Sequence, residues 1–248
     1  MRHRGRAALP SVLALLLAAS LLAVWTGASG AARVGSGGQG LVQRTEELAV
    51  LNGPHVAMSA PDTHSVALQL VSARRPITGE RTALPVIGHK TAAQGMQWLR
   101  VLLPGRPNGH SGWIERRGTA VAVTSWHIIV NTAERRVTVY ENGLPMRAFK
   151  AVVGKPSTPT PNGEFFIEEA VQLRPSDVGA PFALALSARS NVLQEFDGGP
   201  GQIALHGLAN IGGVLGTAVS HGCVRLDTNA MRWLVNRVGP GVPVTITK

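Results

Sequence analysis

Cysteine is almost absent from this sequence: Cys223 is the single one in 248 residues. A lone thiol cannot form an internal disulfide, which excludes a fold held together by disulfide bridges. Charged residues are also few, at 15% beside 44% hydrophobic residues, and this balance excludes a disordered chain. Aromatic residues make up only 4%, whereas glycines number 29 and prolines 16, so short strands joined by many turns are favoured over a helical bundle.

The N-terminus has the three parts of an export signal. Arginines at positions 2, 4 and 6 form a positive region, residues 11–25 are uncharged and mostly apolar, and small residues follow. We therefore predict a signal peptide over residues 1–32 and a protein that works outside the cytoplasmic membrane, at the cell wall. The apolar run is short for a membrane span of about 20 residues, so a retained signal anchor is the second choice.

The sequence is basic, with 24 lysines and arginines against 14 aspartates and glutamates and a formal charge of +10. Removing the three arginines of the signal leaves +7. Such a charge attracts anionic polymers, and for an exported protein the candidate partner is an anionic cell-envelope polymer. A surface that is merely rich in lysine and arginine is the alternative. No nucleic-acid-binding motif is present, and nucleic acid is not expected as a partner.

Two segments precede the motif-rich half of the chain. Residues 33–65 are rich in glycine and serine at their start and poorly patterned after it, which predicts a linker, with a short helix over 45–51. Residues 66–118 are predicted as a small all-β module, because short apolar runs alternate with glycine and proline turns. The runs are Val66–Leu70, Leu84–Gly88, Trp98–Leu103 and Gly112–Ile114. Their order resembles a bacterial SH3-like barrel, a domain type that often binds wall peptides; a spacer that only packs on its neighbour is the alternative.

From residue 125 onward the pattern is again strand-rich. Asn142-Gly143 is a strong hairpin signal, because both residues tolerate the backbone conformation of a two-residue turn. Residues 228–238 carry apolar side chains at helical spacing before a Gly-Pro stop signal and predict the one helix of this half. Residues 173–181 are expected to form a mobile loop. The expected strands are residues 128–130, 137–140, 146–153, 163–167 and 242–246.

The cysteine lies in the run Ser220-His221-Gly222-Cys223-Val224-Arg225-Leu226, with a His206-Gly207 pair upstream. A thiol attacks a carbonyl as the thiolate, and a neighbouring imidazole can take its proton. His206 and His221 are the candidate bases. Backbone N–H groups near Gly222 and Cys223 would stabilise an oxyanion. Arg225 would either hold a carboxylate or fix the loop through hydrogen bonds to carbonyl groups.

Other interpretations stay open at this point. His206, His221 and Cys223 are also residue types that bind zinc, although their spacing does not match a standard zinc signature. A cysteine that serves as a small buried hydrophobic residue is the structural alternative, but an unpaired cysteine in an exported protein needs a reason. We expect neither a metal nor a cofactor.

The pair His206-Gly207 followed by the run from Ser220 to Leu226 closely resembles the signature of L,D-transpeptidase (YkuD-type) catalytic domains. Upstream segments extend the resemblance to about half of the chain. They are Val137–Tyr140, Asn142-Gly143, Val153–Lys155 and Thr160–Phe165. The resemblance implies a mainly β fold, with a sandwich- or barrel-like catalytic domain over residues 125–248 that has one or two short helices, preceded by the SH3-like barrel.

The resemblance also implies roles for individual residues. Cys223 would be the nucleophile and His206 its general base, with the imidazole oriented by the backbone carbonyl of Gly207. Residues 173–181 would belong to a flap over the donor site. The residues that would shape the oxyanion hole and its loop are Ser220, His221 and Gly222. The residues that would bind substrate are Arg225 and Tyr140.

The implied reaction joins two peptidoglycan stem peptides, a donor and an acceptor, by a 3→3 cross-link. It passes through a cysteine thioester and releases D-alanine from a tetrapeptide donor. Water as the acceptor would make the protein an L,D-carboxypeptidase, and a decayed site would leave a catalytically inactive wall-binding protein. Carbapenem β-lactams are expected as covalent inhibitors.

Overall fold

The structure, a computed structural model, describes residues 42–248. The signal peptide expected over residues 1–32 and the first part of the linker expected over 33–65 lie outside the described residues. Within residues 42–248, no helix is long and apolar enough to cross a membrane. The export of the protein therefore stays a prediction.

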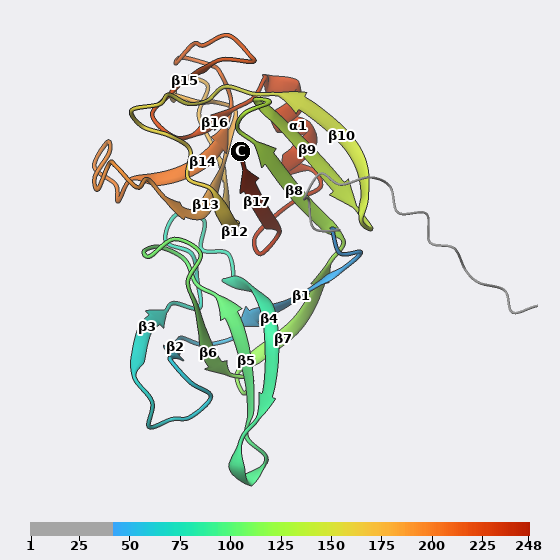
Figure 1. The fold of residues 1–248 in the computed structure, drawn as a ribbon, viewed down its shortest axis with the longest axis vertical. Helices are drawn as coiled ribbons and strands as arrows, with labels where there is room; N and C mark the ends of the chain where they lie inside the picture. Colours follow the sequence, from blue (N-terminus) through green and yellow to red (C-terminus); the bar gives the residue numbers. More distant parts are fainter. Residues whose placement is uncertain (1–41) are drawn as a thin grey trace, which may run out of the picture. The chain divides into compact units, whose positions relative to one another are not determined.

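Residues 46–124 form a seven-stranded sheet of antiparallel neighbours in the order β3-β2-β6-β5-β4-β1-β7 (Figure 1). Its core is apolar, and Leu84, Leu99, Val101 and Ile114 are fully buried in it. The strands are β1 (Glu46–Leu51), β2 (His55–Met58), β3 (Ala67–Val71), β4 (Ala83–Thr91), β5 (Gln97–Leu102), β6 (Ser111–Glu115) and β7 (Thr119–Thr124), with a short 3-10 helix η1 (Ala93–Gly95).

The helix expected over residues 45–51 is wrong. Residues 46–51 form β1, which lies between β4 and β7 and pairs with both. Leu48, Ala49 and Leu51 are buried there. Backbone pairing on both sides overrides the helical preference of glutamate, leucine and alanine in this stretch.

Residues 126–247 form an eight-stranded sheet in the order β10-β9-β8-β17-β12-β13-β14-β16, and β11 and β15 pair beside it. The expectation of a mainly β fold is confirmed. The elements are β8 (Trp126–Asn131), β9 (Arg136–Glu141), β10 (Leu144–Lys150), β11 (Val153–Gly154), β12 (Gly163–Gln172), β13 (Phe182–Arg189), β14 (Gln202–His206), β15 (Ala218–Ser220), β16 (Val224–Arg225), the helix α1 (Thr228–Val235) and β17 (Pro243–Thr247).

Two local predictions in this half are confirmed. Asn142 and Gly143 have φ values of 53° and 76° and join β9 to β10 as a two-residue hairpin turn. The helix α1 begins after Asp227, whose side chain accepts a hydrogen bond from the backbone N–H of Ala230 at 2.9 Å. Its buried face packs into the core of the eight-stranded sheet.

Candidate active site

The two strands that carry the signature residues run parallel and side by side. The register pairs Leu205 of β14 with Val224 of β16, and His206 with Arg225. Leu205 and Val224 are fully buried in the core. Because side chains alternate between the faces of a strand, His206 and Arg225 share the opposite face, and Cys223 directly precedes β16.

His206 is held in one orientation by backbone groups. The carbonyl oxygen of Gly207 lies 2.8 Å from Nδ1. Since a carbonyl oxygen only accepts, Nδ1 carries the proton of the neutral ring and Nε2 presents a lone pair. Burial lowers the pKa of His206, and the nearby charge of Arg225 lowers it further, against the opposing effect of the Gly207 carbonyl. The buried imidazole is thus favoured in the neutral form that acts as a base.

Two glycines allow the backbone to pack closely around this histidine. A Cβ on Gly207 would lie 1.9 Å from the carbonyl oxygen of Ala180. A Cβ on Gly179, whose φ is +84°, would lie 2.5 Å from His206 Nδ1. The N–H of Gly207 donates to the carbonyl oxygen of Gly179 at 2.7 Å. The loop expected over residues 173–181 therefore packs directly against the imidazole.

Cys223 is partly exposed, and its Sγ lies 3.9 Å from the carbonyl oxygen of Gln202. Burial raises the pKa of the thiol, while a backbone hydrogen bond from Ala204 and the charge of Arg225 oppose this. Together with the lowered pKa of His206, this favours a neutral thiol and a neutral imidazole in the resting site.

The loop between β15 and β16 is closed by Ser220. Its Oγ donates to the carbonyl oxygen of Cys223 at 2.6 Å and accepts from the N–H of Gly222 at 3.1 Å. Gly222 has a φ of +122°, and a Cβ there would lie 2.9 Å from Cδ1 of Ile203. Ser220 and Gly222 therefore shape the turn that presents the thiol, and the N–H of Gly222 is already used inside that turn.

Arg225 is buried, and its Nη1 donates to the carbonyl oxygen of Gly212 at 3.2 Å. Within the described residues, its Nε has no hydrogen-bond partner. The contact with Gly212 favours the loop-fixing alternative for this arginine. Its charge also acts on both reactive groups, because it lowers the pKa of Cys223 and of His206.

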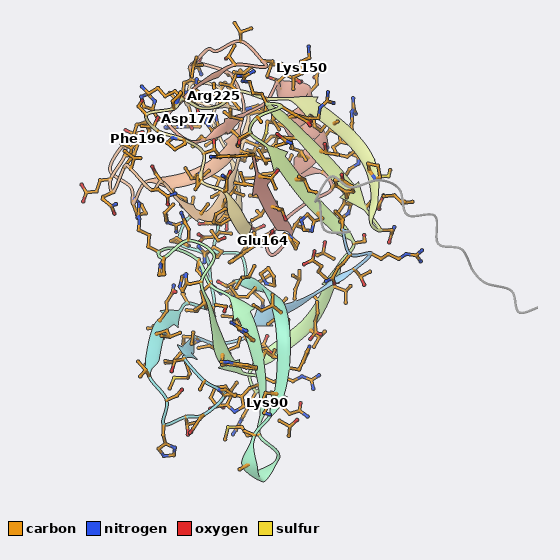
Figure 2. All side chains as sticks on the ribbon, viewed as in Figure 1. Lys90, Lys150, Glu164, Asp177, Phe196 and Arg225 are labelled. Carbon is orange, nitrogen blue, oxygen red and sulfur yellow. The ribbon has the colours of Figure 1, made fainter. Side chains whose placement is uncertain are left out.

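His221 and Tyr140 lie apart from the buried pair. The His221 side chain is exposed and stacks on Phe196, with ring centroids 5.4 Å apart and an interplanar angle of 29°. Figure 2 labels Phe196 and Arg225 on the same half of the fold. Tyr140 lies on β9, and β8, β17, β12 and β13 separate that strand from β14 in the sheet (Figure 1). Tyr140 pairs across the sheet with His127 and Pro145, and within residues 42–248 no hydrogen bond or ring contact joins it to the other signature residues.

Residues 125–246 match the sequence model of the family described as YkuD, the L,D-transpeptidase catalytic domain. This segment is a YkuD-type L,D-transpeptidase domain.

Two relatives and one solved structure are similar to this chain. The YkuD protein of Bacillus subtilis is 31% identical over 126 residues, which cover 50% of this chain and 66% of that protein. L,D-transpeptidase 1 of Mycobacterium tuberculosis is 28% identical over 130 residues, which cover 48% of this chain and 49% of that protein. The solved structure of L,D-transpeptidase 3 of M. tuberculosis, in complex with a faropenem-derived adduct, matches 80% of this chain and 95% of its own at 13% identity and a TM-score of 0.42.

Two threonines of the L,D-transpeptidase domain support the cysteine loop and were not among the residues predicted for the site. Thr158 Oγ1 donates to the carbonyl oxygen of Ser220 at 3.2 Å. Thr160 Oγ1 donates to the carbonyl oxygen of Gly222 at 2.8 Å and accepts from the N–H of Gly154 at 2.9 Å. The only sequence signal is that threonines stand at alternate positions of a proline-rich stretch. Such a stretch does not pair as a strand, so its side chains are free to bind the backbone of a neighbouring segment.

Metal binding was the outside alternative for the signature residues of this L,D-transpeptidase domain. Among residues 42–248, no group of three or more histidine, cysteine, aspartate or glutamate side chains lies close enough together to hold a metal ion. His206, His221 and Cys223 therefore do not form such a group.

Proposed function

We propose that this protein is an exported peptidoglycan L,D-transpeptidase that forms 3→3 cross-links through a thioester on Cys223. The observation that carries the proposal is the parallel pairing of β14, which ends at His206, with β16, which begins directly after Cys223. The hydrogen bond between Nδ1 of His206 and the Gly207 carbonyl leaves Nε2 unprotonated. The family of residues 125–246 supports the class of reaction.

In the first step the thiol reacts with a donor tetrapeptide stem. Cys223 turns its Sγ from the carbonyl of Gln202 toward Nε2 of His206, and the proton moves to the imidazole as Sγ attacks. The S–C bond forms at the carbonyl of the third residue, and the C–N bond to D-alanine breaks. The imidazolium returns its proton to the leaving amine. Because burial lowers the pKa of His206 and raises that of Cys223, we expect proton transfer to accompany the attack.

The oxyanion of this step needs backbone donors near the thiol. Since the N–H of Gly222 is bonded to Ser220, the N–H of Cys223 is the donor we assign to the oxyanion. The charge of Arg225, on the same face as His206, stabilises the negative charge that develops at Sγ and at the oxyanion.

In the second step the thioester reacts with an acceptor stem. The side-chain amine of the acceptor's third residue attacks the thioester carbonyl, the C–S bond breaks, and His206 takes the proton of the amine and returns it to Sγ. A thioester stores the energy of the broken amide outside the cytoplasm, where no ATP is available. We also propose that carbapenem β-lactams acylate Cys223, because the same thiol attacks a lactam carbonyl.

The test uses the protein without residues 1–32, an unlabelled disaccharide-tetrapeptide and the same compound labelled with ¹⁵N. Product masses and fragmentation are expected to show dimers of mixed label, each lacking one D-alanine and joined between third residues. The variant Cys223→Ala, the control, forms none. Tripeptide without dimer would assign the L,D-carboxypeptidase reaction instead, and unchanged tetrapeptide would contradict the proposal.

A further inference from the structure

The loop that joins β5 to β6, residues 103–110, crosses from the seven-stranded sheet to the L,D-transpeptidase domain. We call it the Arg106 loop. Arg106 Nη1 donates to the carbonyl oxygen of Pro200 at 3.0 Å. Its Nη2 donates to the carbonyl oxygens of Ser190 at 2.8 Å and Leu193 at 3.1 Å. One guanidinium thus binds three carbonyl groups of a single segment that lies more than 80 residues further along the sequence.

That segment, residues 190–201, joins β13 to β14, and we call it the Phe196 hairpin. Asn108 of the Arg106 loop binds its base: Nδ2 donates to the carbonyl oxygen of Arg189 at 2.7 Å and to Oδ1 of Asn191 at 2.9 Å. Asn108 Oδ1 accepts from the N–H of Arg189 at 2.8 Å. A Cβ on Gly201 would lie 2.1 Å from the carbonyl oxygen of Leu193, so the two legs of the hairpin approach closely beneath the guanidinium.

The tip of the hairpin is a tight turn. Phe196 and Gly199 exchange backbone hydrogen bonds of 2.9 and 3.0 Å, and Asp197 and Gly198 between them have φ values of 51° and 74°. This is the geometry of a type I′ turn. It presents Phe196, which is 51% exposed, to the ring of His221 at 5.4 Å between centroids. His221 is two residues from Cys223.

Burial does little to fix the position of this hairpin. Residues 194–198 and 200 are all exposed. Few apolar contacts and an exposed backbone are typical of a segment that opens locally at low cost in free energy. The hydrogen bonds from Arg106 and Asn108 are therefore the interactions that hold the hairpin where Phe196 meets His221. Within residues 42–248, no carboxylate forms a salt bridge with Arg106, so its donors are committed to carbonyl oxygens.

We propose that Arg106 is a positioning residue of the active site: it holds the Phe196 hairpin so that Phe196, stacked on His221, forms an apolar wall that contacts the donor stem peptide. The seven-stranded sheet then contributes to catalysis through the Arg106 loop. The contact with the donor rests on the proposed function. The placement of Phe196 does not.

The placement is tested by the NMR signals of the His221 ring in protein labelled at histidine. A phenyl ring stacked on an imidazole shifts its proton signals upfield, so Phe196→Leu is expected to move the His221 signals downfield. Arg106→Ala is expected to reproduce that movement, Arg106→Lys to reverse it in part, and Arg116→Ala, an arginine bonded to Gln97, to leave the signals unchanged. Wild-type signals in Arg106→Ala would overturn the proposal.

The contact with the donor is tested by a double-mutant cycle on the acylation of Cys223. Arg106→Ala and Phe196→Ala are each expected to lower kcat/KM by roughly tenfold, chiefly through KM, and the double variant to lose no more than either alone. Additive losses would refute a role of Arg106 through Phe196. If the wild type is not acylated, the proposed function fails, and the NMR signals alone decide the placement.

Discussion

Phe165 and Phe166 are neighbours on β12 and are buried in two different cores. Each is 1% exposed, and Phe165 packs in the core of the L,D-transpeptidase domain whereas Phe166 packs in that of the seven-stranded sheet. Because successive side chains of a strand point to opposite faces, β12 serves both cores at once. The seven-stranded sheet is therefore packed on the catalytic domain through a strand of that domain.

Glu168, two residues further along β12, is expected to stabilise this packing. Its carboxylate binds Arg75, in the connection between β3 and β4, and Arg189 of β13, and its side chain is only 1% exposed. Burial lowers the pKa of Arg189 to about 10. Glu168→Gln would remove the buried carboxylate that both arginines bind and should lower the free energy of unfolding by about 3–5 kcal/mol. Urea denaturation measures this.

The matched control is Glu134→Gln, which removes a carboxylate that is 62% exposed and 3.7 Å from Arg136. A surface pair of this kind should change stability by about 0–1 kcal/mol. Equal losses in the two variants would show that the buried ion pairs do not hold the packing together.

The two histidines of the signature are expected to differ in their contribution. His206 is buried and oriented by Gly207, so His206→Gln should lower the rate of Cys223 acylation by about 10²–10⁴-fold. His221→Gln should lower it by roughly tenfold or less, because the exposed His221 ring supports Phe196 in the apolar wall that contacts the donor and takes no part in proton transfer. Stopped-flow acylation rates decide between them, and the reverse order would make His221 the base.

The pH dependence of acylation follows from two opposite pKa shifts, that of His206 downward and that of Cys223 upward. Burial lowers the pKa of His206, so the base stays unprotonated, and acylation should persist, at pH values below the ordinary imidazole pKa of about 6.5. Arg225→Gln removes a charge that lowers the pKa of both His206 and Cys223. In that variant the acid limb of the pH–rate profile should move to higher pH.

Arg225→Lys, which retains the charge, is the control for this shift and should keep the acid limb near that of the wild type. An acid limb in Arg225→Gln at the wild-type pH or below it would show that the charge does not act on His206. Thermal melts of both variants identify any loss of folding.

Thr160 is expected to stabilise the cysteine loop through its hydroxyl group. Thr160→Val would leave the N–H of Gly154 and the carbonyl of Gly222 without this partner, at a cost of about 1–3 kcal/mol for each buried group. Thr160→Ser retains the hydroxyl and should keep most of the stability. If valine and serine variants melt at the same temperature, these two bonds contribute nothing measurable.

Local chemistry made parts of the fold and the site predictable. The Asn142-Gly143 turn and α1 follow from neighbouring residues alone. Cys223 and His206 were predicted from their chemical types and from the resemblance, and the structure adds that β14, which ends at His206, pairs with β16, which begins directly after Cys223. Their catalytic roles stay predictions.

Contacts between distant segments were the unpredictable part. Residues 66–70 are one of the apolar runs of the predicted all-β module, yet Leu68 and Leu70 are 47% and 69% exposed on β3. Alternation along the chain predicts two faces but not which one meets a core, and β3 lies at the edge of its sheet. The hydrogen bonds of Arg106 likewise depend on how two sheets pack, which no short motif encodes.

The most direct test of the account is the intact mass of the wild type and of Cys223→Ala after incubation with a carbapenem, followed by peptide mapping. We expect one equivalent of drug on the wild type, located on the peptide that contains Cys223, and none on the variant. An unmodified wild type, or an adduct that persists in Cys223→Ala, would contradict the assignment of this thiol as the nucleophile.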